Sequence, residues 1–123
     1  EIRLLTNFEI DSFNALTVLL CGREDLAMQF DLSILEPLAN SITLTVHLEA
    51  LAREESFNYI EERLRHCGNS DPVFTKNALE LTHQASAGIM RDINAIAQGA
   101  MVNAYLSNSH QVEAEHVKAA IER

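Results

Sequence analysis

The sequence predicts a short α/β segment over residues 1–49, followed by an all-α unit of four helices over residues 50–123. Two apolar stretches predict strands in the first part, LTVLLCG at 16–22 and ITLTVHL at 42–48. From about residue 50 onward, apolar residues recur every three or four positions, which is the period of amphipathic helices. A chain of 123 residues has the length of one domain or of part of one.

The first part begins with a short helix and contains two strands of different kinds. Ile2, Leu5 and Phe8 recur at helical spacing. Residues 16–22 form a continuous apolar run that ends at a glycine, which indicates a strand buried on both faces of a parallel sheet. Residues 42–48 alternate apolar and polar side chains, which indicates a half-exposed strand at a sheet edge.

Residues 23–41 connect the two predicted strands. They carry leucine and phenylalanine at helical intervals, and Pro37 interrupts the pattern. Because proline lacks a backbone donor and clashes with the preceding turn, we expect helical turns with a break near Pro37.

Residues that favour helix ends support the four helices predicted from the apolar spacing. Glu54 and Glu55 favour the start of the first helix, and Gly68 is its C-cap. Thr75 is the candidate N-cap of the second helix, and Gly88 ends it. The third helix is predicted over about 90–106, and the fourth from about residue 113. The residues predicted to face inward are Phe57, Ile60, Leu64, Cys67, Ala78, Leu81, Ala85, Ile93, Ile96, Ala97, Ala100, Met101, Ala104, Val117, Ala120 and Ile121.

Composition and charge argue against several classes of function. Eighteen acidic residues against nine Lys and Arg give a net charge of -9, which repels phosphate backbones and argues against a main nucleic-acid surface. No apolar run has the length of a membrane span, and the first residues do not form a signal peptide. Cys21 and Cys67 have no metal-binding spacing, so we expect reduced structural thiols in a cytoplasmic protein.

The histidines do not predict a metal site. Each belongs to a different predicted element, and none forms the i, i+4 pair that binds a metal on a helix. They are His47, His66, His83, His110 and His116.

Five phrases of the sequence, taken in order, carry a family resemblance. They are RLLTNFEIDS at 3–12, LTVLLCGREDL at 16–26, ITLTVHLEAL at 42–51, EESFNYIEERLRHCG at 54–68 and FTKNALELTHQASAGIMRDIN at 74–94. Their order and spacing resemble the second half of an AAA+ ATPase, of the family that includes the general secretion pathway protein A ATPases and ATPases encoded beside transposases. The resemblance covers essentially the whole chain. It implies the C-terminal half of an AAA+ P-loop NTPase domain, in which residues 1–49 end the α/β nucleotide-binding core and residues 50–123 form the helical lid.

The phosphate-binding motifs of such an ATPase do not occur in this sequence. It contains no GxxxxGK(S/T) phrase (Walker A) and no apolar run ending in Asp-Glu (Walker B). The resemblance implies that both motifs precede residue 1 in a full-length protein that binds ATP and Mg²⁺ and hydrolyses ATP. We do not expect the 123 residues alone to be active.

The resemblance assigns roles to three positions. Arg91 matches the sensor-2 arginine, which reaches from the lid to the γ-phosphate of ATP, and a guanidinium suits phosphate oxygens because it offers forked donors. Met90 stands where the family usually has proline. Arg23 is the sensor-1 candidate, at a position where the family often has glutamine. Ser41 occupies the position of an arginine finger and lacks the charge that stabilises the transition state.

The resemblance also implies partners, and two alternatives remain open. The full-length protein would be a homo-oligomer, assembled through its α/β core, that acts on secretion machinery or on a transposase, with any DNA contact in the missing half. The first alternative is a non-catalytic helical module for protein interactions. The second is a DNA-binding helix–turn–helix over 75–94, whose candidate recognition helix carries Arg91 beside Asp92 and is poorly suited to the major groove.

The two predicted strands flank a missing strand in the order implied by the resemblance. They would therefore lack ladder partners in this chain. We expect residues 1–49 to be disordered, rearranged or paired with a second copy.

Overall fold

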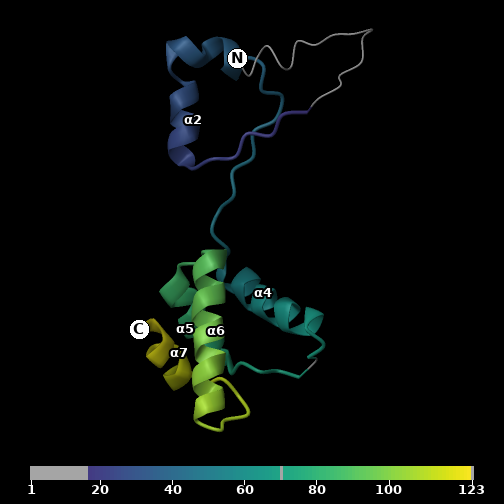
Figure 1. Ribbon diagram of the computed structural model, residues 1–123, viewed down its shortest axis with the longest axis vertical. Helices are drawn as coiled ribbons and strands as arrows, with labels where there is room; N and C mark the ends of the chain where they lie inside the picture. Colours follow the sequence, from purple (N-terminus) through teal and green to yellow (C-terminus); the bar gives the residue numbers. More distant parts are fainter. Residues whose placement is uncertain (1–16, 70, 123) are drawn as a thin grey trace. The chain divides into compact units, whose positions relative to one another are not determined.

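The computed structural model describes residues 17–69 and 71–122, and the chain divides into two compact units, Glu1–His47 and Leu48–Arg123 (Figure 1). Within the described residues the regular structure consists of six α-helices and one short 3-10 helix. The helix predicted over residues 2–8 lies outside the described residues.

The first unit contains the helical turns predicted over 23–41. They are α2 (Glu24–Phe30), the 3-10 helix η1 (Ser33–Leu35) and α3 (Glu36–Ala39). The break follows α2, earlier than predicted. Pro37 instead lies in the first turn of α3, where its missing N–H would have had no partner within the helix.

The two predicted strands are not formed in the part of the chain that the structure describes, and this corrects the sequence prediction. Residues 17–22 and 42–48 are irregular, and the side chains of Leu19 and Val46 are 83% and 68% exposed. A strand needs a neighbour to satisfy its backbone N–H and C=O groups, and no described segment pairs with either stretch. The apolar pattern alone therefore did not produce a sheet.

The four helices predicted after residue 50 are confirmed. They are α4 (Arg53–His66), α5 (Lys76–Ser86), α6 (Met90–Leu106) and α7 (Ala114–Ile121). In Figure 1, α6 runs between α4 on one side and α5 and α7 on the other, and it contacts all three. The longest helix is thus the central element of this unit.

The end of α4 and the start of α5 have the predicted caps, and the start of α4 has a further one. Thr75 Oγ1 accepts a hydrogen bond from the Ala78 N–H at 3.3 Å, which satisfies a free donor at the start of α5. The Ala52 N–H donates to Glu55 Oε2 at 2.8 Å at the start of α4. Gly68 follows α4 with a φ of 86°, the left-handed conformation that glycine adopts without strain.

A single hydrophobic core joins the four helices. Its buried members are Phe57, Ile60, Phe74, Ala78, Leu79, Ile93, Ala97, Ala100, Ala104, Val112 and Val117. Small residues of α6 allow α7 to approach closely, since a Cβ added at Gly99 would lie 3.0 Å from the Cβ of Ala120. The Thr75 N–H also donates to the Val112 carbonyl at 3.0 Å, which joins the segments that enter α5 and α7.

Some residues predicted to face inward do not. Ala85, Cys67 and Ile121 are exposed, because each lies at the edge of its helix's apolar face or at a helix end. Cys21 and Cys67 are both free and exposed, so their interpretation as structural thiols is wrong.

Candidate functional site

Arg91 lies in the first turn of α6 and extends into solvent. Its side chain is 87% exposed, and its Nε lies 3.4 Å from Oδ1 of the neighbouring Asp92. The residue before the helix, Ile89, provides no side-chain cap for the first N–H groups of α6. The start of α6 therefore combines an exposed guanidinium with the positive end of a helix of 17 residues.

A tight turn fixes the backbone that precedes Arg91. Ala87 and Gly88 both have positive φ, 49° and 76°, which reverses the chain between α5 and α6. The Leu51 N–H donates to the Gly88 carbonyl at 2.9 Å. A Cβ added at Gly88 would lie 2.2 Å from the Leu51 carbonyl oxygen, so only glycine allows this contact. We call this contact the Leu51–Gly88 clasp. It connects the segment that enters α4 to the turn that carries Arg91.

A second contact ties the start of α6 to α4. Tyr59 Oη lies 3.0 Å from Nδ2 and 3.2 Å from Oδ1 of Asn94, one turn after Arg91. Sequence reasoning missed both this pair and the Leu51–Gly88 clasp. Asn94 was part of the family phrase, but no local pattern connects it to a tyrosine 35 positions earlier.

An ion pair joins the start of α4 to α5. Arg53 Nε donates to Glu80 Oε2 at 2.6 Å, and the Arg53 guanidinium carbon lies 4.8 Å from the centre of the Phe57 ring. The hydrogen bond from Arg53 lowers the pKa of the Glu80 carboxyl, and the same bond raises the pKa of Arg53. This pair holds the entry to α4 against α5.

The other two candidate positions lie in the first unit. Arg23 precedes α2, with its side chain 93% exposed and its Nε 3.8 Å from Asp25 Oδ1. Ser41 is exposed, and its Oγ donates to the Pro37 carbonyl at 3.1 Å, which ends α3.

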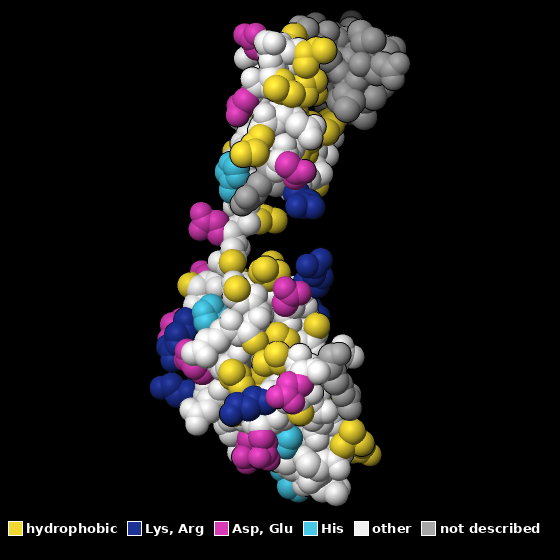
Figure 2. Space-filling view, turned by 90° about the vertical axis from the view of Figure 1, so that its left-hand side faces the viewer, with side chains coloured by type: hydrophobic (Ala, Val, Ile, Leu, Met, Phe, Trp, Pro, Cys, Tyr) yellow, Lys and Arg dark blue, Asp and Glu magenta, His cyan; other side chains and the backbone are white. Residues whose placement is uncertain are grey.

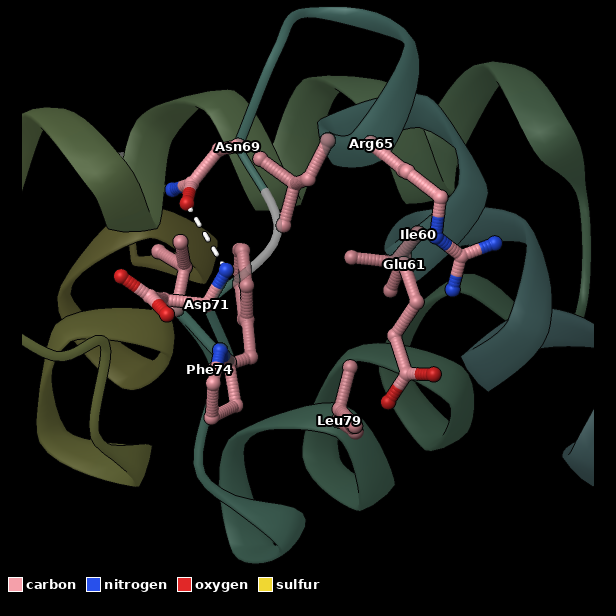
Figure 3. Close-up of a pocket in the computed structure, with 10 residues that line it drawn as sticks. Ile60, Glu61, Arg65, Asn69, Asp71, Phe74 and Leu79 are labelled. Atoms are coloured by element: carbon pink, nitrogen blue, oxygen red, sulfur yellow. Dashed lines mark hydrogen bonds between the residues drawn. The ribbon is translucent and has the colours of Figure 1, made fainter.

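A shallow pocket of about 160 Å³ opens between the end of α4 and the start of α5 (Figure 3). The side chains of Ile60, Phe74 and Leu79 form its apolar wall, and Glu61 and Arg65 stand at its rim. Asn69 Oδ1 accepts a hydrogen bond from the Asp71 N–H at 3.0 Å beside it. None of the sequence-predicted site residues lines this pocket.

Two histidines have structural partners. His116 is buried and accepts the Glu113 N–H at its Nδ1, 3.0 Å away, while its Nε2 lies 2.9 Å from Ser107 Oγ. Because Nδ1 accepts, Nε2 carries the proton, and the pair cannot work as a serine–base dyad. His83 Nδ1 lies 2.9 Å from the buried Ser56 hydroxyl. Across residues 17–69 and 71–122, no group of three or more His, Cys, Asp and Glu side chains is arranged to hold a metal ion.

Among the described helices, none is both long and apolar enough to cross a membrane.

Comparison with known proteins gives one informative similarity. The chain is 37% identical over 112 residues to General secretion pathway protein A of Aeromonas hydrophila. The aligned part covers 91% of this chain and 20% of that protein, so the chain spans about a fifth of the length of its relative. No protein-family model matches the chain, and no solved structure matches it. The similarity supports, as a partial match, the family indicated by the motifs: the chain resembles a segment of General secretion pathway protein A.

Proposed function

We propose that this chain is the C-terminal part of an AAA+ ATPase domain, and that the full-length protein couples ATP hydrolysis to the work of secretion machinery. In this proposal residues 50–123 form the helical lid, and residues 1–49 end the α/β core. The observation that carries the proposal is the 37% identity to General secretion pathway protein A over 112 residues. The four helices of the second unit support the lid assignment.

Arg91 is the residue that we propose for sensing the γ-phosphate of ATP. Its guanidinium is 87% exposed and stands at the positive end of α6, so phosphate oxygens would meet a charged donor and helix N–H groups together. Its Nε lies 3.4 Å from the carboxylate of the neighbouring Asp92. An exposed ion pair of this kind is weak and can be exchanged for a phosphate.

ATP and Mg²⁺ would be held mainly by the Walker motifs of the full-length protein. Mg²⁺ would neutralise charge on the phosphates during attack by water. This chain would contribute Arg91 from the lid, and Arg23 as the sensor-1 candidate. Ser41 offers no positive charge at the finger position, so in this proposal a finger must come from another residue.

The partner that we propose belongs to secretion machinery. The name of the relative supports secretion, whereas transposition rests on the family resemblance alone. We propose a homo-oligomer in the cytoplasm as the working form.

The test is ATP hydrolysis by the full-length protein. We expect GxxxxGK(S/T) and an apolar strand ending in Asp-Glu upstream of Glu1, and we expect ATPase activity. Arg91→Ala should lower kcat by about tenfold or more, which corresponds to about 1.4 kcal/mol of lost transition-state stabilisation. The matched control is Arg63→Ala, which removes another exposed arginine, on α4, and should leave kcat unchanged.

Two results would contradict the proposal. Absence of both upstream motifs together with absence of hydrolysis would favour the non-catalytic interaction module. Hydrolysis that survives Arg91→Ala unchanged would keep the ATPase and remove the sensing role of Arg91.

A further inference from the structure

The longest charge-free stretch of the chain coincides with most of α6. The twenty residues between Asp92 and Glu113 include no Lys, Arg, Asp or Glu. At the chain's charged fraction of 22%, a stretch of this length would hold about four charged residues. Elsewhere on the same unit, acidic and basic side chains are interspersed, as Figure 2 shows for one face. The absence of charge is therefore a local property of α6 and of the loop that follows it.

This stretch includes a helix face that α4, α5 and α7 leave exposed, apart from the contact of Asn94 with Tyr59 of α4. The exposed residues of α6 after its first turn recur at helical spacing and form one stripe: Asn94, Ala95, Gln98, Val102, Tyr105 and Leu106. Val102, Tyr105 and Leu106 are 45%, 80% and 66% exposed. The opposite side of α6 is the core side, with Ile93 and Ala100 fully buried. We call these six exposed residues the α6 stripe.

The two ends of the α6 stripe differ in size. Its first half carries Asn94, Ala95 and the flexible Gln98, whereas its second half carries the large apolar side chains of Tyr105 and Leu106. An antiparallel copy of the same helix would set each large end against a small end. With a two-fold axis that crosses the α6 stripe at the level of residue 100, Tyr105 would face Ala95 of the second copy, and Val102 would face Gln98. Two-fold contacts require such self-complementarity, because each residue pair occurs twice.

The charge of the chain indicates which kind of partner could bind the α6 stripe. Two copies of a chain with a net charge of -9 repel each other over most of their surfaces. At the α6 stripe, two copies can meet without opposing acidic side chains, because none of its six residues is charged. A strongly charged partner would form no ion pair with the α6 stripe. Burial of the apolar side chains of Tyr105 and Leu106 is favourable only against an uncharged surface, such as the α6 stripe of a second copy.

We propose that the α6 stripe is a self-association surface, on which α6 of a second copy packs antiparallel about a two-fold axis. This contact is separate from the assembly through the α/β core that the family resemblance implies, and it does not depend on ATP. Contact between single helix faces is small compared with the roughly 1,200–2,000 Å² of stable complexes, so the dimer is weak and depends on concentration.

The experiment is sedimentation equilibrium of the 123-residue chain under reducing conditions, over an about hundredfold range of concentration. The wild type should convert from monomer to dimer across this range. Ala95→Glu and Tyr105→Lys should each raise the dimer dissociation constant by about tenfold or more. Ala85→Glu, at an exposed alanine of α5, adds the same charge outside the α6 stripe and should leave the dissociation constant unchanged.

Mixing the two stripe variants tests the register. Glu at position 95 of one copy then faces Lys at position 105 of the other, so the mixture should dimerise more strongly than either variant alone. Because both positions are exposed, the variants should retain the helical circular dichroism of the wild type. A wild type that stays monomeric at the highest concentration would overturn the proposal, as would variants with unchanged dissociation constants. A mixture with no recovery would overturn the antiparallel register.

Discussion

Replacing Gly88 by alanine tests whether the Leu51–Gly88 clasp stabilises the second unit. Gly88 has a φ of 76°, and its added Cβ would lie 2.2 Å from the Leu51 carbonyl oxygen. Gly68 provides the matched control. It has a similar φ of 86°, but a Cβ there would have no atom within 4 Å. The two Gly→Ala variants therefore share the backbone strain and differ in the clash.

The expected magnitudes follow from this difference. Alanine in the left-handed conformation costs about 1–2 kcal/mol, so both variants should lose this much free energy of unfolding. In Gly88→Ala the Leu51 backbone must also move away, which breaks its hydrogen bond to Gly88, worth about 1 kcal/mol, and exposes part of the Leu51 side chain, worth about 1 kcal/mol more. We therefore expect Gly88→Ala to lower the free energy of unfolding by about 2 kcal/mol more than Gly68→Ala.

The assay is urea unfolding followed by circular dichroism, with thermal melting as a second measurement. For a unit of this size, a difference of about 2 kcal/mol corresponds to a difference of roughly 8–16 °C in Tm. Equal losses in the two variants would refute the reasoning, because they would mean that the Leu51–Gly88 clasp contributes no stability.

Three further predictions concern the core and the polar contacts of the second unit. His116→Ala should lower the free energy of unfolding by about 2–3 kcal/mol in the same urea assay, because it leaves the Glu113 N–H without its acceptor. His110→Ala, at an exposed position, should change this free energy by less than about 0.5 kcal/mol. Ile93→Ala should cost about 2–5 kcal/mol in unfolding experiments, since Ile93 is fully buried in the first turn of α6, and a loss below about 1 kcal/mol would contradict the described core. Glu80→Gln should destabilise the chain at neutral pH. The hydrogen bond from Arg53 lowers the folded-state pKa of Glu80, so the stability that this carboxylate contributes is present above the ordinary carboxyl pKa and is lost as the pH falls through the lowered value. The free energies of unfolding of wild type and variant, measured in urea at a series of pH values, should therefore converge in acid. A constant difference would contradict this.

The sequence predicted the helices of the second unit well, because their signals are local. The apolar period indicates α4 to α7, Gly68 ends α4 and Thr75 caps the start of α5, as expected. The predicted strands failed for a physical reason. The stretches at 16–22 and 42–48 have apolar patterns, but a strand forms only beside another strand, and no described segment supplies one.

The contacts around Arg91 were not predictable from local patterns. The Leu51–Gly88 clasp and the pair of Tyr59 with Asn94 join residues that lie about 35 positions apart in the chain. The sequence placed Arg91 at the start of a helix, and the structure places it there. Its proposed role rests on the family resemblance, since spacing alone does not distinguish a sensing arginine from a solvated one.

The most direct test of the central claim is the preference of the full-length protein for ATP over ADP, measured by titration calorimetry with ADP and a slowly hydrolysed ATP analogue. If Arg91 contacts the γ-phosphate, Arg91→Ala should weaken binding of the ATP analogue by about tenfold and leave ADP binding unchanged. Arg63→Ala should change neither affinity. If Arg91→Ala weakens both nucleotides equally, or neither, Arg91 does not sense the terminal phosphate.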